Sequence, residues 1–218
     1  MKVIGIGLNK TGTKTLKNLL ESNGYLHQSY DLDAFNHYRA GRIDELLDWV
    51  DRYDSFEDWP WPLIYQEIDQ RFPDAKFILT VRTSPEIWYQ SLCKMAVRMG
   101  PLNDYERHIY GYSMPQGRKK QHIEFYQRHV AEVQEYFAGR ENKLVKVCIG
   151  NQEHEQQLAE FLNIDLPGKP LPKTNESLPV YAGENLFRGQ LARIQFQTKW
   201  KLKGWYRGLR RRLFSGPK

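Results

Sequence analysis

The first fifteen residues constrain the fold of this chain most strongly, because an apolar run is followed at once by a turn rich in hydroxyl groups. Val3 to Leu8 is apolar throughout apart from two glycines, as expected for a parallel strand covered on both faces. The turn Asn9 to Thr15 holds two lysines, three threonines and a glycine, and a helical pattern begins at Leu16. N–H groups at such a helix start favour an anion. The loop therefore predicts a phosphate site.

Two common phosphate-binding patterns come close to this loop and fail. The dinucleotide-binding pattern needs a third glycine where Lys10 stands, although Gly5 and Gly7 fit. The Walker pattern needs a lysine directly after its second glycine, but Thr13 follows Gly12. A tight turn without a ligand is the alternative, although a bare turn has no need of two lysines and three threonines.

Apolar runs alternate with helical patterns along the rest of the chain. Strands are expected at 25–30, 53–56, 77–81 and 144–149, and helices at 16–21, 43–50, 63–72, 85–99, 123–137 and 155–162. Such alternation predicts an α/β fold with a central parallel sheet flanked by helices. Ligands bind beyond the carboxyl ends of the strands in such sheets, where we expect the loop after Leu8 and the turns at Asp58 and Arg82.

Charge divides the chain into a body and a tail, which we place at residues 1–184 and 185–218. The tail holds ten of the 32 Lys and Arg residues and none of the 26 Asp and Glu residues. The body is left with 22 basic and 26 acidic residues, so its affinity for a phosphate must come from local sites. The basic character of the whole chain is a property of the tail.

Cysteine spacing and the absence of targeting patterns indicate a cytoplasmic protein. Cys93 and Cys148 lie far apart without zinc-type spacing and read as free thiols. Neither a signal-peptide pattern nor an apolar run of about eighteen residues is present. No cluster of His, Cys, Asp or Glu has the spacing of metal ligands, so we expect no metal.

The segment Asn9-Lys10-Thr11-Gly12-Thr13-Lys14-Thr15-Leu16 resembles the 5′-phosphosulfate loop of sulfotransferases. The similarity to the bacterial type continues at 58–69 and 72–82, then at 109–111, 126–129 and 172–175, and covers roughly residues 1–178. It implies a P-loop-like three-layer fold and the donor 3′-phosphoadenosine 5′-phosphosulfate (PAPS). It also implies transfer of a sulfuryl group to a hydroxyl without a metal.

The resemblance also implies roles for particular residues. Lys10 would stabilise the charge that builds on the oxygen leaving the sulfuryl group. The rest of the 5′-phosphosulfate cradle would come from Thr11, Gly12, Thr13, Lys14 and Thr15. Arg82 and Ser91 would hold the 3′-phosphate of the donor, since a planar guanidinium suits a phosphate. Ser91 lies nine residues after Arg82 instead of the family's eight, which one extra residue in the turn would explain.

A hydroxyl acceptor needs a base near the attacking oxygen, and Asp58 is our first candidate. It follows the third strand at a place where cytosolic members of the family carry a histidine. A carboxylate between Phe56 and Trp59 is expected to have a raised pKa, although Asp58 also reads as a plain turn residue before a proline. Further candidates are His27, Asp31, Asp33, His37 and Glu67.

Two segments beyond the core pattern indicate possible partners. Residues 95–122 combine aromatic and basic side chains that suit a sugar or an anion, or form a solvated loop: Arg98, Tyr105, Arg107, His108, Tyr110, Tyr112, Arg118, Lys119 and Lys120. In the tail, apolar residues share one helical face: Leu202, Trp205, Tyr206, Leu209 and Leu213. Basic residues lie mainly on another face. This pattern favours an interfacial helix on an anionic membrane, or packing against the body, over a nucleic-acid patch.

We therefore expect a sulfotransferase that acts on a hydroxyl of a carbohydrate, a glycolipid or a small molecule, at the inner face of a membrane if the tail binds there. A P-loop kinase is the first alternative, although the misplaced lysines and the lack of a clear magnesium-binding aspartate count against it. A nucleotide-binding module without catalytic activity is the second alternative.

Overall fold

The computed structural model describes residues 1–98, 105–167, 171 and 185–214. Two compact units make up the chain: the first comprises Met1–Pro85 and Tyr126–Glu176, and the second comprises Glu86–Phe125 and Ser177–Lys218. Neither unit is continuous in sequence, and no pattern in the sequence indicated this. The boundary that we placed after residue 184 stays a prediction. The segment 172–175 of the family resemblance lies outside the described residues.

The first unit is built on a five-stranded sheet in which every neighbouring pair is parallel. Its strands are β1 (Val3–Gly5), β2 (His27–Gln28), β3 (Ser55–Phe56), β4 (Lys76–Thr80) and β5 (Leu144–Val147), in the spatial order β2-β3-β1-β4-β5. Val3 of β1 is in register with Ser55 of β3 on one side and with Lys76 of β4 on the other. The carboxyl end of β1 therefore lies between those of β3 and β4.

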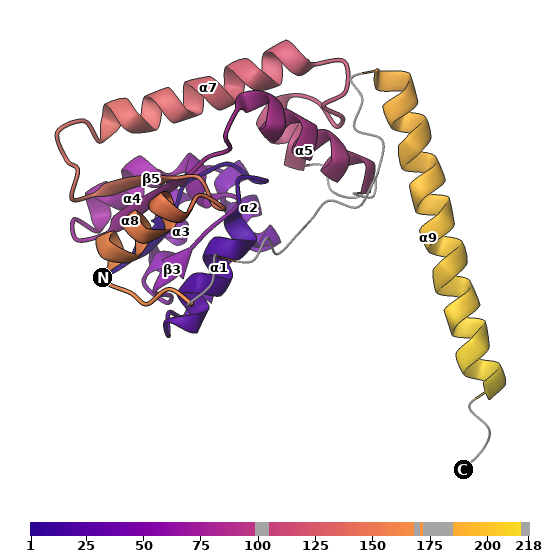
Figure 1. The fold of residues 1–218 in the computed structure, drawn as a ribbon, viewed down its shortest axis with the longest axis horizontal. Helices are drawn as coiled ribbons and strands as arrows, with labels where there is room; N and C mark the ends of the chain where they lie inside the picture. The colour runs from indigo at the N-terminus through magenta and orange to yellow at the C-terminus, as the bar shows by residue number, and fades with distance from the viewer. Residues whose placement is uncertain (99–104, 168–170, 172–184, 215–218) are drawn as a thin grey trace. The chain divides into compact units, whose positions relative to one another are not determined.

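Helices cover both faces of the sheet, which gives the three layers that the sequence predicts (Figure 1). One layer holds α1 (Thr13–Ser22) and α8 (Gln152–Leu162), and the other holds α2 (Leu32–Arg39), α3 (Ile43–Val50), α4 (Tyr65–Arg71) and the second half of α7 (Lys119–Tyr136). Side chains of a strand point alternately to its two faces. Val3 accordingly packs with the α1 layer, whereas Ile4 and Ile6 pack with the other.

Several elements differ from the prediction. The strands predicted at 25–30 and 53–56 are only two residues long each, and β1 ends at Gly5 instead of Leu8. The predicted helix at 63–72 is a 3₁₀ turn, η1 (Trp61–Leu63), followed by α4. Helix α2 was not predicted, although Asp31 is a typical N-cap whose carboxylate accepts hydrogen bonds from the N–H groups of Asp33 and Ala34.

The second unit contains α5 (Pro85–Arg98) from Glu86 onward, α6 (Tyr105–Tyr110), the start of α7, and α9 (Leu186–Phe214). The Tyr89 hydroxyl donates to the carbonyl of Pro115 over 2.9 Å, which ties α5 to the loop that follows α6. Helix α9 is much longer than the amphipathic pattern that we recognised in the tail. Its backbone is described to Phe214, whereas the side chains of Tyr206, Leu209 and Leu213 lie outside the described residues.

Candidate functional site

The loop between β1 and α1 is held in a conformation that few residues adopt. Gly12, the N-cap of α1, has φ of 112°, and Lys10 has φ of 69°, so both lie in the left-handed region. A lysine there is strained, and such strain is concentrated at functional sites. Among the described residues no side chain caps the first turn of α1. The Thr15 N–H donates to the Gly12 carbonyl over 3.0 Å, and the N–H groups of Thr13 and Lys14 face an uncapped helix start, which suits an anion.

Glycine is required at two positions of this segment because neighbours approach closely. A Cβ on Gly7 would lie 2.0 Å from the Thr80 hydroxyl oxygen, so β1 and β4 leave no room for a side chain. A Cβ on Gly12 would lie 2.8 Å from Cγ1 of Ile149, which follows β5. The loop is thus pressed against the ends of two other strands, and its path is fixed.

The residues predicted to form the cradle have different surroundings. The Thr11 hydroxyl is fully buried, donates to the Leu8 carbonyl over 2.6 Å and lies 2.6 Å from the Thr80 hydroxyl. Thr13 and Thr15 are also buried, whereas Lys14 is exposed. Thr11 therefore ties the loop to β4, so its hydroxyl is occupied within the fold.

Arg82 follows β4 and reaches toward the loop. Its Nε donates to the carbonyl of Lys10 over 2.6 Å, and its backbone N–H donates to the Tyr126 hydroxyl over 2.9 Å. Partial burial lowers the pKa of Arg82, which means that the site makes its charge more costly. Within the described ranges no carboxylate forms an ion pair with this guanidinium. A half-buried cation in such surroundings is suited to an external anion.

Asp58 follows β3, on the other side of β1 from Arg82. It too has a left-handed backbone, with φ of 67°, and its Oδ1 accepts a hydrogen bond of 2.9 Å from the N–H of Trp59. Burial, assisted by the carboxylate of Glu57, raises the pKa of Asp58 to about 7. The Trp59 N–H and the positive charges of Lys10 and Lys14 oppose this rise. Asp58 therefore titrates near neutrality, as a general base should.

Glu57 is a residue of this site that sequence reasoning missed. It is fully buried, accepts a hydrogen bond from the Ser29 hydroxyl, and its Oε1 lies 3.8 Å from Nε2 of His27. His27 in turn lies 2.7 Å from the Ser55 hydroxyl through Nδ1. The other oxygen of Glu57, Oε2, is buried with no hydrogen-bond partner among the described residues. The sequence did contain a signal for Glu57, because an acidic residue directly after a buried strand lies where such sheets bind ligands.

The other candidate bases belong to the surrounding scaffold. His27 contacts Glu57 as described, and Asp31 caps α2. Nδ1 of His37 lies 2.9 Å from the carboxylate of Glu45. Asp33 lies in the first turn of α2, and Glu67 lies in the first turn of α4. A role as base for any of them stays a prediction.

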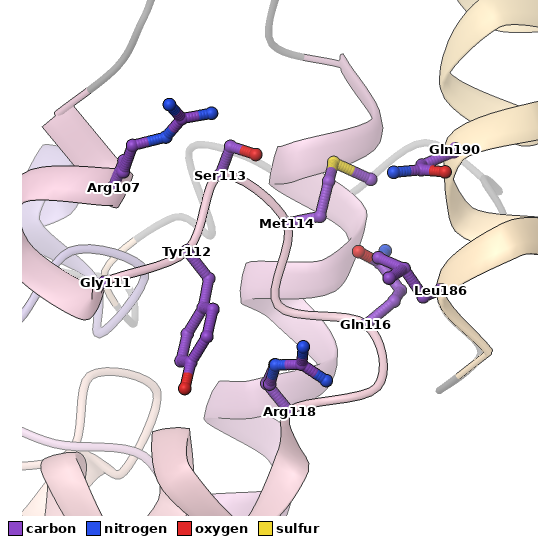
Figure 2. Close-up of a pocket in the computed structure, with 9 residues that line it drawn as sticks. All are labelled: Arg107, Gly111, Tyr112, Ser113, Met114, Gln116, Arg118, Leu186 and Gln190. Carbon is purple, nitrogen blue, oxygen red and sulfur yellow. The ribbon is translucent and has the colours of Figure 1, made fainter.

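Ser91 and the aromatic and basic segment belong to the second unit. Ser91 lies on α5 and is partly exposed, and its role stays a prediction. Figure 2 shows a pocket of about 280 Å³ whose lining includes Arg107, Tyr112, Ser113, Gln116, Arg118 and Gln190. Its side chains come from α6, the loop after it and the first turns of α9. Three members of the predicted segment thus gather around one cavity, while residues 99–104 lie outside the described part.

The pocket combines positive charge with a buried acceptor. The Arg118 guanidinium carbon lies 4.8 Å from the centroid of the Tyr112 ring, a cation–π geometry. Gln116 is fully buried and donates to the Cys93 carbonyl over 3.1 Å. Its side-chain oxygen has no partner within the described part of the chain. A buried acceptor without a partner is costly, so this oxygen stores unfavourable free energy beside the pocket.

Two kinds of feature are absent from the described residues. They contain no group of three or more His, Cys, Asp or Glu side chains arranged to hold a metal ion. No helix among them combines the length and the apolar character needed to cross a membrane.

Comparison with known proteins identifies the class. The sulfotransferase domain family matches residues 2–179, which is most of the chain, so the protein belongs to this family. It is accordingly a transferase that moves a sulfuryl group. The crystal structure of a sulfotransferase from Mycobacterium avium is similar with a TM-score of 0.46 and 9% identity, over 91% of this chain and 76% of that one. A search of curated protein sequences finds no match.

Proposed function

We propose that this sulfotransferase takes its sulfuryl group from PAPS and transfers it to a hydroxyl of a carbohydrate, a glycolipid or a small molecule. One observation supports the proposal: Asp58, the loop before α1 and the half-buried Arg82 follow the carboxyl ends of three neighbouring strands, in the order β3-β1-β4. Ligands bind beyond the carboxyl ends of the strands in open parallel sheets.

The residues of the loop suit the phosphosulfate end of the donor. N–H groups at the uncapped start of α1 and the Lys14 ammonium would hold its 5′-phosphate, with Gly12 allowing close approach. Lys10 would stabilise the negative charge that builds on the oxygen bridging sulfur and this phosphate. Arg82, which has no ion pair within the described part of the chain, would hold the 3′-phosphate. Thr11, Thr13 and Thr15 are buried and would fix the shape of the loop.

Asp58 would accept the proton of the acceptor hydroxyl. The acceptor oxygen forms a bond to sulfur while the bond from sulfur to the bridging oxygen breaks, and the proton passes to Asp58 as the acceptor attacks. The product that leaves is adenosine 3′,5′-bisphosphate, whose new charge faces Lys10. A pKa of about 7 supports this role, because Asp58 is then largely ionised just above neutrality and still a useful base.

The pocket of the second unit is our candidate for binding the acceptor. Two arginines would attract an anionic group. The tyrosine in its wall offers an aromatic surface for a sugar ring or a similar apolar face. We therefore propose an acceptor that carries both hydroxyls and negative charge.

Thermal unfolding with added nucleotide tests the donor. Adenosine 3′,5′-bisphosphate without magnesium should raise Tm by about 5 °C or more at saturating concentration. Lys10→Ala and Arg82→Ala should both remove most of this rise. Lys17→Ala is the matched control, because Lys17 lies on α1, shortly after the loop, but pairs with Glu21 over 2.9 Å; this variant should respond like the original protein.

Two outcomes would overturn the assignment. Full stabilisation of either site variant would remove that residue from the donor site. Stabilisation by ATP only in the presence of magnesium, with no response to adenosine 3′,5′-bisphosphate, would point to phosphoryl transfer. Transfer of labelled sulfuryl from PAPS to a panel of carbohydrates and glycolipids then identifies the acceptor.

A further inference from the structure

Helix α9 carries an exposed apolar stripe. Phe187, Leu191, Ile194, Leu202 and Trp205 recur at helical spacing on one face of the helix. All are largely exposed, from 45% for Leu191 to 73% for Phe187. Their recurrence over the length of the helix distinguishes them from the single exposed apolar residues found on ordinary surfaces.

The stripe is not the face through which α9 packs within its own unit. Gly189 is buried, and a Cβ there would lie 2.7 Å from Cγ of Gln116. Arg193 donates from Nη1 to the sulfur of Met114 over 3.2 Å. Gly189 and Arg193 share one side of the helix, whereas Phe187, Leu191 and Ile194 lie on the opposite side. The α9 stripe is therefore left without a partner among the described residues of the second unit.

Basic residues flank the α9 stripe. Arg188 and Lys199 lie along one border and Lys201 lies along the other, and all three are exposed. The whole tail from 185 to 218 contains ten Lys and Arg residues and no Asp or Glu. Such a helix, with an apolar face bordered by cations, matches the amphipathic helices that lie in the interface of an anionic bilayer.

We propose that α9 binds the surface of an anionic membrane, with its apolar stripe in contact with acyl chains and its flanking cations at the lipid head groups. Charge complementarity decides between occupants: a second copy of this chain would bring a tail of the same sign, which would repel. The proposal is independent of the donor and the acceptor of sulfuryl transfer.

Vesicle co-sedimentation of the full chain tests the proposal. The protein should bind vesicles of phosphatidylcholine mixed with phosphatidylglycerol, and bind phosphatidylcholine alone much more weakly. Phe187→Ser with Ile194→Ser should reduce binding about tenfold or more, because two apolar anchors are lost. The matched control is Leu26→Ser with Leu32→Ser, since these residues are 57% and 59% exposed but lie outside α9, and its binding should not change.

Three substitutions test how much the flanking cations contribute to membrane binding. Arg188→Gln, Lys199→Gln and Lys201→Gln together should weaken binding about tenfold or more, and added salt should do the same. An equal loss of charge elsewhere, through Arg52→Gln, Lys120→Gln and Arg128→Gln, should have a much smaller effect. Circular dichroism confirms that each variant is folded.

Three outcomes would overturn the proposal: equal binding to neutral and anionic vesicles, unchanged binding by the stripe variant, or a dimer in solution that does not bind vesicles. Binding to single-stranded nucleic acid with no binding to vesicles would overturn it as well. Donor binding by thermal shift is measured on the same samples, so a failure here is distinct from a failure of the proposed function.

Discussion

Two helix starts, at Gly12 of α1 and at Gly189 of α9, use glycine for different reasons. Gly12 has φ of 112°, and a Cβ there would also meet Ile149 at 2.8 Å. Gly189 has ordinary helical geometry, and a Cβ there would meet only the side chain of Gln116, at 2.7 Å. The first position is restricted by its backbone, and the second by one side chain that can move.

This difference extends to the two sites. At the carboxyl ends of β3, β1 and β4, Lys10 and Asp58 both have left-handed backbones, and Arg82 is held through the Lys10 carbonyl. The pocket of the second unit is instead lined by side chains of α6, a loop and α9. A donor common to a family suits a site fixed by backbone, and a variable acceptor suits one built from replaceable side chains. The predictions below separate these two kinds of site.

The largest effect is expected at Asp58, where chemistry can be changed without changing the backbone. Asparagine tolerates the left-handed conformation, so Asp58→Asn should retain the turn. Loss of the base should lower kcat for sulfuryl transfer by about 10² to 10⁴-fold, while binding of adenosine 3′,5′-bisphosphate is retained. Steady-state kinetics and thermal shift measure the two quantities. A kcat within a few-fold of the original would exclude Asp58 as the base.

The same variant has a stability effect whose sign follows from the pKa. Asp58 has a folded-state pKa of about 7, above its ordinary value of 3.8, so the folded protein holds a proton that the unfolded chain releases. Its contribution to stability is therefore full below about pH 4 and declines as pH rises toward about 7. Asp58→Asn removes this decline, so Tm should exceed that of the original protein at about pH 8 and match it near pH 4.

The second-largest effect is expected in the backbone of the loop between β1 and α1. Gly12→Ala should lower the free energy of unfolding by about 2 kcal/mol or more, because the left-handed penalty is joined by the contact with Ile149. Gly24→Ala is the matched control, since Gly24 has φ of 82° and nothing within 4 Å of its Cβ position. Urea unfolding measures both. Equal losses of unfolding free energy in the two variants would mean that the contact with Ile149 adds no cost at Gly12.

Much of the candidate site at the carboxyl ends of β3, β1 and β4 could be predicted from the sequence, because its signals are local. The apolar run, the glycines and the hydroxyl-rich turn are contiguous, and parallel topology brings strand ends together. Asp58 was found because it follows a strand, and its expected rise in pKa agrees with the structure. The lengths of two strands were overestimated. β2 and β3 are only two residues long each, and apolar residues next to them contribute to the core without extending the strands.

The rest depended on contacts between distant segments. Glu57 affects Asp58 through its charge, and Glu57 is itself contacted by Ser29 and His27, which lie about thirty residues earlier in the chain. The pocket joins residues 107–118 with 186–190, which no local pattern relates. The hydroxyl of Thr11 reads as a ligand in the sequence, yet its pairing with Thr80 becomes apparent only when β1 and β4 are neighbours.

A smaller effect is expected at Glu57, which adjusts the base without touching it. Its carboxylate contributes to the raised pKa of Asp58, so Glu57→Gln should lower that pKa while burial still holds it above the ordinary value. Because Asp58 acts when ionised, the rise of kcat with pH should shift to lower pH. Glu67→Gln is the control and should leave the profile in place. A profile that is unchanged or shifted to higher pH in Glu57→Gln would contradict this coupling.

The smallest effect is expected at Gly189, because a side chain rather than a backbone restricts it. Gly189→Ala gains about 1 kcal/mol of helix propensity but must displace Gln116, so the free energy of unfolding should change by less than about 1 kcal/mol. The displaced side chain enters the pocket, which should raise KM for an acceptor chosen from the carbohydrate panel about threefold or more. The kcat and the donor-induced Tm rise should not change.

Gly204→Ala, about four turns further along α9, is the control because it provides the same gain in helix propensity. An unchanged acceptor KM together with a lower kcat in Gly189→Ala would remove the pocket from acceptor binding.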